Sequence, residues 1–178
     1  MKEISIGFAK FRAWESDRPN LKFSTERVLT ALIHASHRVA VRRIAMLEAY
    51  VPLGGMANYG LLGGEFCPDE SGVLAVRIHL GKPSGASFAE ALAARVDDVR
   101  IGLPIEYGNA VLDGIKRGQT GSSALPSGLL TIDHAAHGMV GSSANHFGRV
   151  TEGLMMLLVA KELNESLLNT IGEIIRSS

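Results

Sequence analysis

The sequence has little of several features that would assign it to a common class of protein. Its single cysteine, Cys67, excludes an internal disulfide and a cysteine-rich zinc site. The chain opens without a signal-peptide pattern, so we expect it in the reducing cytoplasm. Lysine and arginine together number 18, as do aspartate and glutamate. This balance creates no overall field that would attract nucleic acid or an anionic membrane, so any contact with RNA must come from a local patch.

A long hydrophobic run is also missing. The segment most similar to a membrane span, residues 39–51, contains Arg42, Arg43 and Glu48 and is too short to cross a bilayer. We therefore expect a soluble protein with no membrane partner. A chain of 178 residues is long enough to bury one well-packed core, and we predict a single domain over residues 1–178.

The clearest helix signal lies in residues 102–117. Pro104 suits the first turn of a helix, and Glu106 places negative charge near the positive end of the helix dipole. One apolar face follows at helical spacing, made by Tyr107, Ala110, Val111, Gly114 and Ile115. Because a glycine on this face lowers helix propensity, we expect Gly114 to allow a close approach of the helix to a sheet.

The N-terminal part predicts one strand and one helix. Apolar residues alternate at the start of residues 3–14, which indicates a strand. After a charged loop, Ser24 is a suitable N-cap for a helix over residues 25–37, which has an apolar stripe. Near its end stand His34 and His37, which we interpret as solvated or capping histidines rather than metal ligands.

Residues 38–50 fit either a strand or a continuation of that helix. We favour a strand, because residues 52–55 end it as a hairpin loop would and because residues 73–80 alternate like a partner strand. Between them, the glycine-rich residues 54–64 are expected to form a loop. They lack the spacing of a nucleotide phosphate-binding loop.

The remaining segments complete the expected order of elements. We predict a short helix at 88–95, a mobile connection at 118–128, a strand at 129–136, a loop at 138–148, a helix at 150–163 and a shorter helix at 167–175.

Three separated stretches resemble domain IV of translation elongation factor G. The family's helix opens with Gly-x-Pro-x-Glu-Tyr, then has Ala-Val and Gly-Ile, and this chain has Gly102, Pro104, Glu106, Tyr107, Ala110, Val111, Gly114 and Ile115. The family's first tip loop is Gly-Gly-x-Gly-Gln-Tyr-Gly, and residues 54–60 are Gly-Gly-Met-Ala-Asn-Tyr-Gly, with Ala57 in place of a glycine. The family also places a tip histidine six residues before a glutamate, as His146 and Glu152 stand here. The three stretches occur in the family's order.

This resemblance implies an α+β fold of the ribosomal protein S5 domain 2 type, a mainly antiparallel sheet with helices packed on one face. The similar core covers about residues 39–163, preceded by a strand and helix in residues 1–38 and followed by a helical tail in residues 164–178. No stretch resembles the family's GTPase domain, and we expect no cofactor.

In the family, the two loops meet at one end of the domain, which enters the decoding site of the small ribosomal subunit. The resemblance therefore implies the ribosome or its RNA as partner. Its candidate contacts are Gly54, Gly55, Asn58, Tyr59, Gly60, Asn145, His146 and Arg149. Glycines let a backbone approach phosphates, and a tyrosine or histidine can stack on an unpaired base. Arg42 and Arg43 would add positive charge if they lay on the same side. The same stretch also fits a tight hairpin with Tyr59 as a core aromatic.

Two other classes of function stay open. His134, His137 and His146 lie near Asp133 in sequence and supply acid and base groups for a small-molecule enzyme or a metal-binding protein. We lean away from an enzyme because no nucleophile motif is present, and catalytic residues are not assigned. The sequence predicts no metal site, and His134 and His137 are only weak candidates for one. The apolar residues 154–159 suit a buried helix or the interface of a homo-oligomer.

Overall fold

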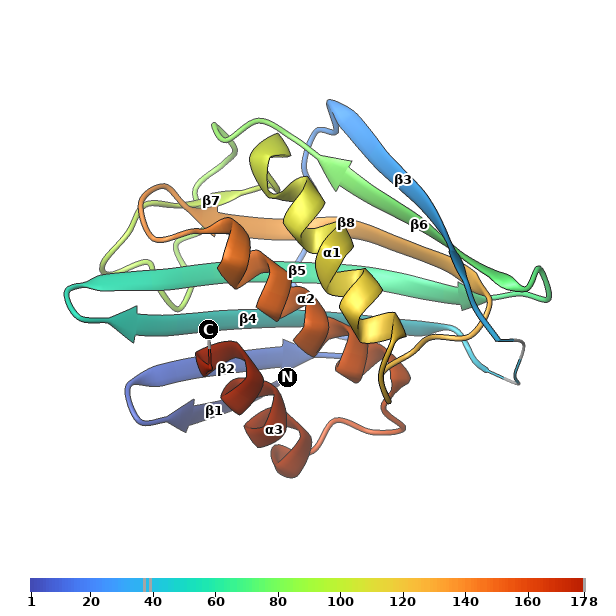
Figure 1. Cartoon of the computed structure of the whole chain (residues 1–178). Helices are drawn as coiled ribbons and strands as arrows, with labels where there is room; N and C mark the ends of the chain where they lie inside the picture. The colour runs from blue at the N-terminus through green and yellow to red at the C-terminus, as the bar shows by residue number, and fades with distance from the viewer. Residues whose placement is uncertain (37, 39, 178) are drawn as a thin grey trace.

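The structure, a computed structural model, describes residues 1–36, 38 and 40–177 and combines one sheet with helices (Figure 1). The strands are β1 (Lys2–Ile6), β2 (Ala9–Trp14), β3 (Arg27–His34), β4 (Arg43–Leu53), β5 (Met56–Pro68), β6 (Val73–Leu80), β7 (Val99–Ile101) and β8 (Gly128–Gly138). The helices are a 3₁₀ turn η1 (Ile105–Tyr107) and the α-helices α1 (Gly108–Gln119), α2 (Ala144–Val159) and α3 (Glu165–Arg176).

The described strands form one sheet in the order β1-β2-β4-β5-β8-β6-β3, with β7 paired to β8 at one end. All pairs are antiparallel except β6 with β8, which are parallel and are linked through α1. The three α-helices lie on one face of this sheet (Figure 1). This arrangement confirms the predicted α+β class, with a mainly antiparallel sheet and helices on one face. Among the described residues, no helix combines the length and apolar character needed to span a membrane.

Both faces of the sheet are covered by apolar packing. On the helix side, Phe11, Leu47 and Leu62 pack with residues of all three α-helices. On the opposite side, a smaller cluster contains Trp14, Met46 and Tyr59 together with residues such as Phe88 from the segment between β6 and β7. Alternate residues of a strand face opposite sides, so the central strands contribute to both cores. The two-sided burial explains why β4 and β5 have long apolar runs.

Several predicted elements are confirmed. The segment at 38–50 contains β4, the helix signal at Pro104 corresponds to η1 and α1, and the strand at 129–136 is β8. Helices at 150–163 and 167–175 correspond to α2 and α3, although α2 starts earlier, at Ala144, where the side chain of Ser143 caps it. The predicted loop at 138–148 is accordingly shorter.

The helix predicted over residues 25–37 is wrong, because Arg27–His34 forms strand β3. From Val28 to His34 its residues alternate between exposed and half-buried, as in a strand with one covered face. Its apolar residues fit both the helical and the strand period; they are Val28, Leu29, Leu32 and Ile33. Pairing with β6 decides in favour of the strand. His34 is exposed at the end of β3, and position 37 lies outside the described residues.

Four other predicted elements also differ from the structure. The loop expected over 54–64 is confined to a turn at Gly54 and Gly55, after which β5 begins. Residues 88–95 form turns rather than a helix. The strand at 3–14 is two strands, broken at Gly7 with a φ of 61°. The segment 73–80 is a strand, β6, but it pairs with β3 and β8, and the neighbours of β4 are β2 and β5.

Candidate functional site

The β4–β5 turn and the β8–α2 loop meet at one end of the sheet, as the resemblance implies. The Tyr59 amide donates to the Gly141 carbonyl at 2.8 Å, and the Ser142 hydroxyl donates to the Tyr59 carbonyl at 2.7 Å. The hydroxyl of Tyr107, from the helix motif, reaches the Ser142 carbonyl at 3.3 Å. We call residues 53–58 and 139–143 with the adjoining residues 93–97 the tip.

Asp97 fixes the β8–α2 loop from a segment that the sequence did not point to. Its carboxylate accepts hydrogen bonds from the backbone amides of Gly141, at 2.7 Å, and Val140, at 3.2 Å. A Cβ at Gly138 would lie 2.1 Å from the same carboxylate, so any side chain there would displace Asp97 from this position. Three segments distant in sequence therefore hold the tip in one conformation.

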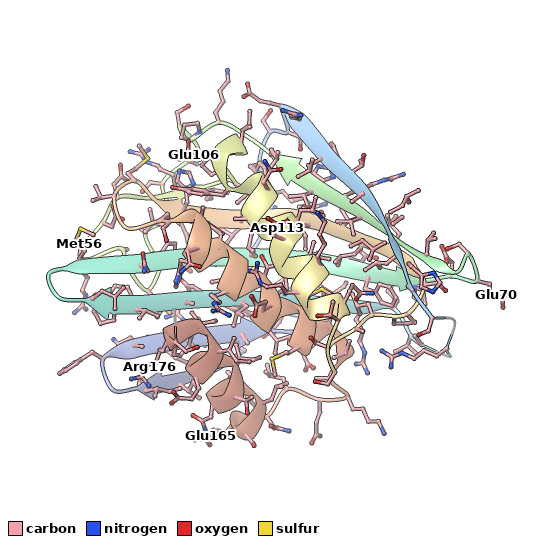
Figure 2. All side chains as sticks on the ribbon, viewed as in Figure 1. Met56, Glu70, Glu106, Asp113, Glu165 and Arg176 are labelled. Carbon is pink, nitrogen blue, oxygen red and sulfur yellow. The ribbon has the colours of Figure 1, made fainter. Side chains whose placement is uncertain are left out.

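A cavity of about 400 Å³ opens between these segments. Its lining includes Tyr50, Met56, Asn58, Val96, Val140 and Ser143. The rim is apolar, since the side chains of Met56 and Val140 are 74% and 83% exposed. Figure 2 places Met56 at the end of the sheet opposite Glu70. Exposed apolar side chains around a hollow are typical of a binding surface.

The residues predicted to contact RNA divide into two groups. Gly54, Gly55 and Asn145 are exposed and Asn58 is half-buried, all at or beside the tip. Tyr59, Gly60 and His146 are buried, so neither ring can stack on a base in this conformation. The alternative interpretation of Tyr59 as a core aromatic fits its burial.

Little positive charge gathers at the tip. Arg149 lies on α2 and pairs with Glu152 at 3.3 Å. Arg42 and Arg43 lie at the start of β4, whereas the tip follows the end of this strand, and Arg42 pairs with Glu65. The sequence had left open whether these two arginines add positive charge to the tip, and their position shows that they do not. Arg95, within the tip, is exposed and has no ion-pair partner among the described residues.

Beneath the tip, the Tyr59 hydroxyl donates to the buried Glu48 carboxylate at 2.9 Å. The same carboxylate accepts from the Leu92 amide at 2.8 Å and from Arg12 at 3.3 Å. Burial raises the pKa of Glu48 above its ordinary value, although the Leu92 amide and Arg12 act in the opposite direction. Burial also raises the pKa of Tyr59. The network joins β2, β4 and β5 to the segment before β7 and supports the tip from below.

Glu48→Gln is expected to remove one pH dependence of stability while keeping an acceptor for Tyr59 and Leu92. A carboxyl group whose pKa is raised in the folded state contributes stability that is fully present below its unfolded pKa. That contribution is lost as the pH rises through the folded pKa. Urea unfolding between pH 4 and pH 7 should therefore show the wild-type protein losing stability relative to Glu48→Gln as the pH rises. Parallel curves for the two proteins would contradict this role of Glu48.

Of the three histidines of the alternative enzyme site, His134 is separated from the other two. His137 pairs with Gly60 of β5, and a Cβ at Gly60 would lie 3.3 Å from the His146 ring, so His137 and His146 lie near the same point on the helix side of the sheet. Ala135 belongs to the helix-side cluster and Ala136 to the opposite one, so His134 and His137 lie on opposite faces of β8. The Nδ1 atom of His134 lies 2.7 Å from Asp133, and that of His137 lies 3.0 Å from the Gly102 carbonyl. No group of three or more potential metal ligands occurs in the part of the chain described here.

His146 lies on α2 over the strand β5. Gly60 makes room for its ring, because a side chain there would lie 3.3 Å from the imidazole. Its Nε2 atom donates weakly to the Ala49 carbonyl at 3.4 Å. Its buried Nδ1, like the buried Nε2 of His137, has no hydrogen-bond partner among the described residues. Burial lowers the pKa of His146 to about 4, so the ring is neutral at pH 7.

Comparison with known proteins adds no assignment to this geometry. The chain matches no family model, no curated protein and no solved structure.

Proposed function

We propose that this chain has the ribosomal protein S5 domain 2-type fold of elongation factor G domain IV and uses the tip to bind the ribosome. The observation that carries the proposal is the meeting of the β4–β5 turn and the β8–α2 loop, joined by the 2.8 Å hydrogen bond from Tyr59 to Gly141. The resemblance identified these two stretches from sequence, in the family's order. The partner would be ribosomal RNA in the cytoplasm.

The contacts that we propose differ from those expected from sequence. Gly54 and Gly55 both have positive φ values, 49° and 95°, and no atom of the described residues lies within 4 Å of a Cβ placed at either one. Their exposed backbone can therefore approach a ribose or phosphate closely. Asn58 and Asn145 supply amide groups, Arg95 supplies a positive charge, and Met56 and Val140 supply apolar surface for an unstacked base.

Few cations lie at the tip, so most of the affinity must come from shape and neutral contacts. Each phosphate neutralised by a cation contributes to the salt dependence of binding. The proposal therefore predicts a modest fall in affinity with salt, smaller than for a protein with a basic RNA-binding patch. The role that we propose for this chain is binding, without hydrolysis of GTP.

The test is sucrose-gradient sedimentation of the tagged protein with purified small ribosomal subunits. Met56→Glu places a negative charge among backbone phosphates, and we expect about a tenfold loss of binding, equivalent to about 1.4 kcal/mol. Because Met56 is 74% exposed, its replacement should leave folding unchanged.

The matched control is Val41→Glu. Val41 is an exposed apolar residue before the start of β4, at the end of the sheet away from the tip. This variant should sediment with subunits as the wild-type protein does. Equal loss for both variants, or a wild-type protein that stays at the top of the gradient at low salt, would refute binding through the tip.

A further inference from the structure

Strand β3 forms an edge of the sheet that helices do not cover. In the part of the chain described, it pairs only with β6, so one side of its backbone ladder is unpaired (Figure 1). The strand is eight residues long and mostly apolar. Leu32 is 76% exposed and Val28 is 41% exposed. A long, uncovered, apolar edge strand readily pairs with another strand.

The backbone groups that remain free can be identified from the pairing with β6. The Ala35 amide donates to the Gly72 carbonyl at 3.2 Å, in the same register that aligns β3 with β6. Hydrogen-bonded and non-hydrogen-bonded pairs alternate along an antiparallel ladder. The odd-numbered residues of β3 therefore bond to β6. Val28, Thr30 and Leu32 direct their amides and carbonyls away from the sheet.

The other edge of the sheet is protected. Strand β1 is five residues long, begins with Lys2 and Glu3, and packs against α3. Short, charged and covered edges resist pairing with a further strand. Of the two edge strands, β3 is therefore the one available for pairing with another strand. It also excludes β3-to-β1 pairing between molecules, which would build an open filament rather than a closed dimer.

We infer that β3 pairs antiparallel with β3 of a second copy of this chain, with the twofold axis at Thr30. In this register Thr30 pairs with Thr30 of the second copy, and Val28 pairs with Leu32. All of these residues carry outward-facing backbone groups, so the pairing gives hydrogen-bond partners to the free amides and carbonyls of the edge. It also places the exposed apolar side chains Val28 and Leu32 opposite each other on one face.

A second copy suits this edge because the strand is complementary to itself. The sequence of alternate residues Val28, Thr30 and Leu32 presents apolar, polar and apolar side chains in either direction. The formal net charge of +0 produces no overall repulsion between two copies. Of the two interpretations of residues 154–159, a buried helix fits and a subunit interface does not, because Leu154, Met155, Leu157 and Leu158 are buried within the chain.

Sedimentation equilibrium of the wild-type protein should give a concentration-dependent mass that reaches that of a dimer. Leu32→Lys places a charge at the interface and should weaken dimerisation at least about tenfold. Phe8→Lys is the matched control, because Phe8 is an 89% exposed residue in the β1–β2 turn, and it should dimerise like the wild type. A wild-type protein that stays monomeric at every concentration would overturn the inference. A dimer that tolerates Leu32→Lys would also overturn it.

The register is tested by cysteine cross-linking in a Cys67→Ser background. Residues directly opposite in an antiparallel ladder have Cα atoms close enough for a disulfide. Thr30→Cys should therefore form a covalent dimer under mild oxidation, and Ala31→Cys, its neighbour on the other face, should form much less. Cross-linking through Ala31→Cys alone, or through neither residue, would reject pairing about Thr30. These outcomes are independent of ribosome binding by the tip.

Discussion

Gly114→Ala is expected to lower the free energy of unfolding by about 2 kcal/mol, although alanine is the better helix former. A Cβ at position 114 would lie 2.5 Å from the backbone carbonyl oxygen of Gly148 and 2.7 Å from the Thr151 side chain. Both belong to α2, so α1 and α2 must move apart. Overpacking costs about 1–3 kcal/mol, and the gain in helix propensity offsets at most about 1 kcal/mol.

Gly118→Ala provides the control on the same helix. The three atoms nearest to a Cβ there all belong to the Met155 side chain, at 3.0 Å or more, so a shift of a few tenths of an ångström would relieve the contact. We expect this substitution to change stability by less than about 1 kcal/mol. Thermal unfolding should separate the two variants, with Tm falling by about 4–8 °C for Gly114→Ala. Equal Tm values would contradict a close contact between the helices at Gly114.

Gly114 illustrates how much of the fold local sequence can predict. The helix was predictable because Pro104, Glu106 and the apolar spacing all favour the same local structure. The need for a close approach followed from a glycine on the packed face. The prediction was that α1 approaches the sheet at Gly114, but α1 approaches α2 there. This contact depends on how α1 and α2 cross. No local pattern contains this information.

Strand β3 shows the opposite case. Its apolar residues fit a helical stripe as well as an alternating strand, and Ser24 offered a plausible cap. The structure is decided by eight paired residues of β6, which lie far along the chain. Tertiary pairing overrides a weak local preference in such segments.

The glycine-rich stretch was misassigned for a related reason. Glycines indicate loops when only local conformation is considered. In β5, Gly64 is instead required, because a Cβ there would lie 2.7 Å from the Ile132 side chain, and Gly60 and Gly63 lie in tight contact with His146 and Met46, at 3.3 Å and 3.0 Å from such a Cβ. Glycine within a strand can mark close packing, and its neighbours come from distant parts of the sequence.

The candidate site was predictable in outline but not in its contacts. Sequence motifs identified two segments that meet at the tip, and Gly54, Gly55 and Asn145 are exposed there. They did not identify Asp97, which lies in a segment for which the sequence predicted neither an element nor a site residue. The burial of Tyr59 depends on Glu48, and that of His146 depends on Gly60, so neither was evident from spacing. These two residues support the tip from the core.

The wild-type protein is expected to lose about 3 kcal/mol of stability from His146 alone as the pH falls from 7 to below 4. Burial lowers the pKa of His146 from 6.5 to about 4, so the folded chain resists protonation that the unfolded chain accepts. A histidine with a lowered pKa contributes stability above its unfolded value of 6.5 and loses it as the pH falls through the folded value. Each pKa unit corresponds to about 1.36 kcal/mol.

His146→Gln separates this effect from the other titrating groups. The glutamine amide can donate to the Ala49 carbonyl in place of Nε2, and it does not titrate. Glu48 contributes in the opposite direction over part of this range, because burial raises its pKa, but it does so equally in both proteins. The difference between the urea unfolding free energies of wild type and variant should therefore shift by about 3 kcal/mol between pH 7 and pH 4, against the wild type. A constant difference would mean that the His146 ring is accessible to water in the folded protein, contrary to its burial.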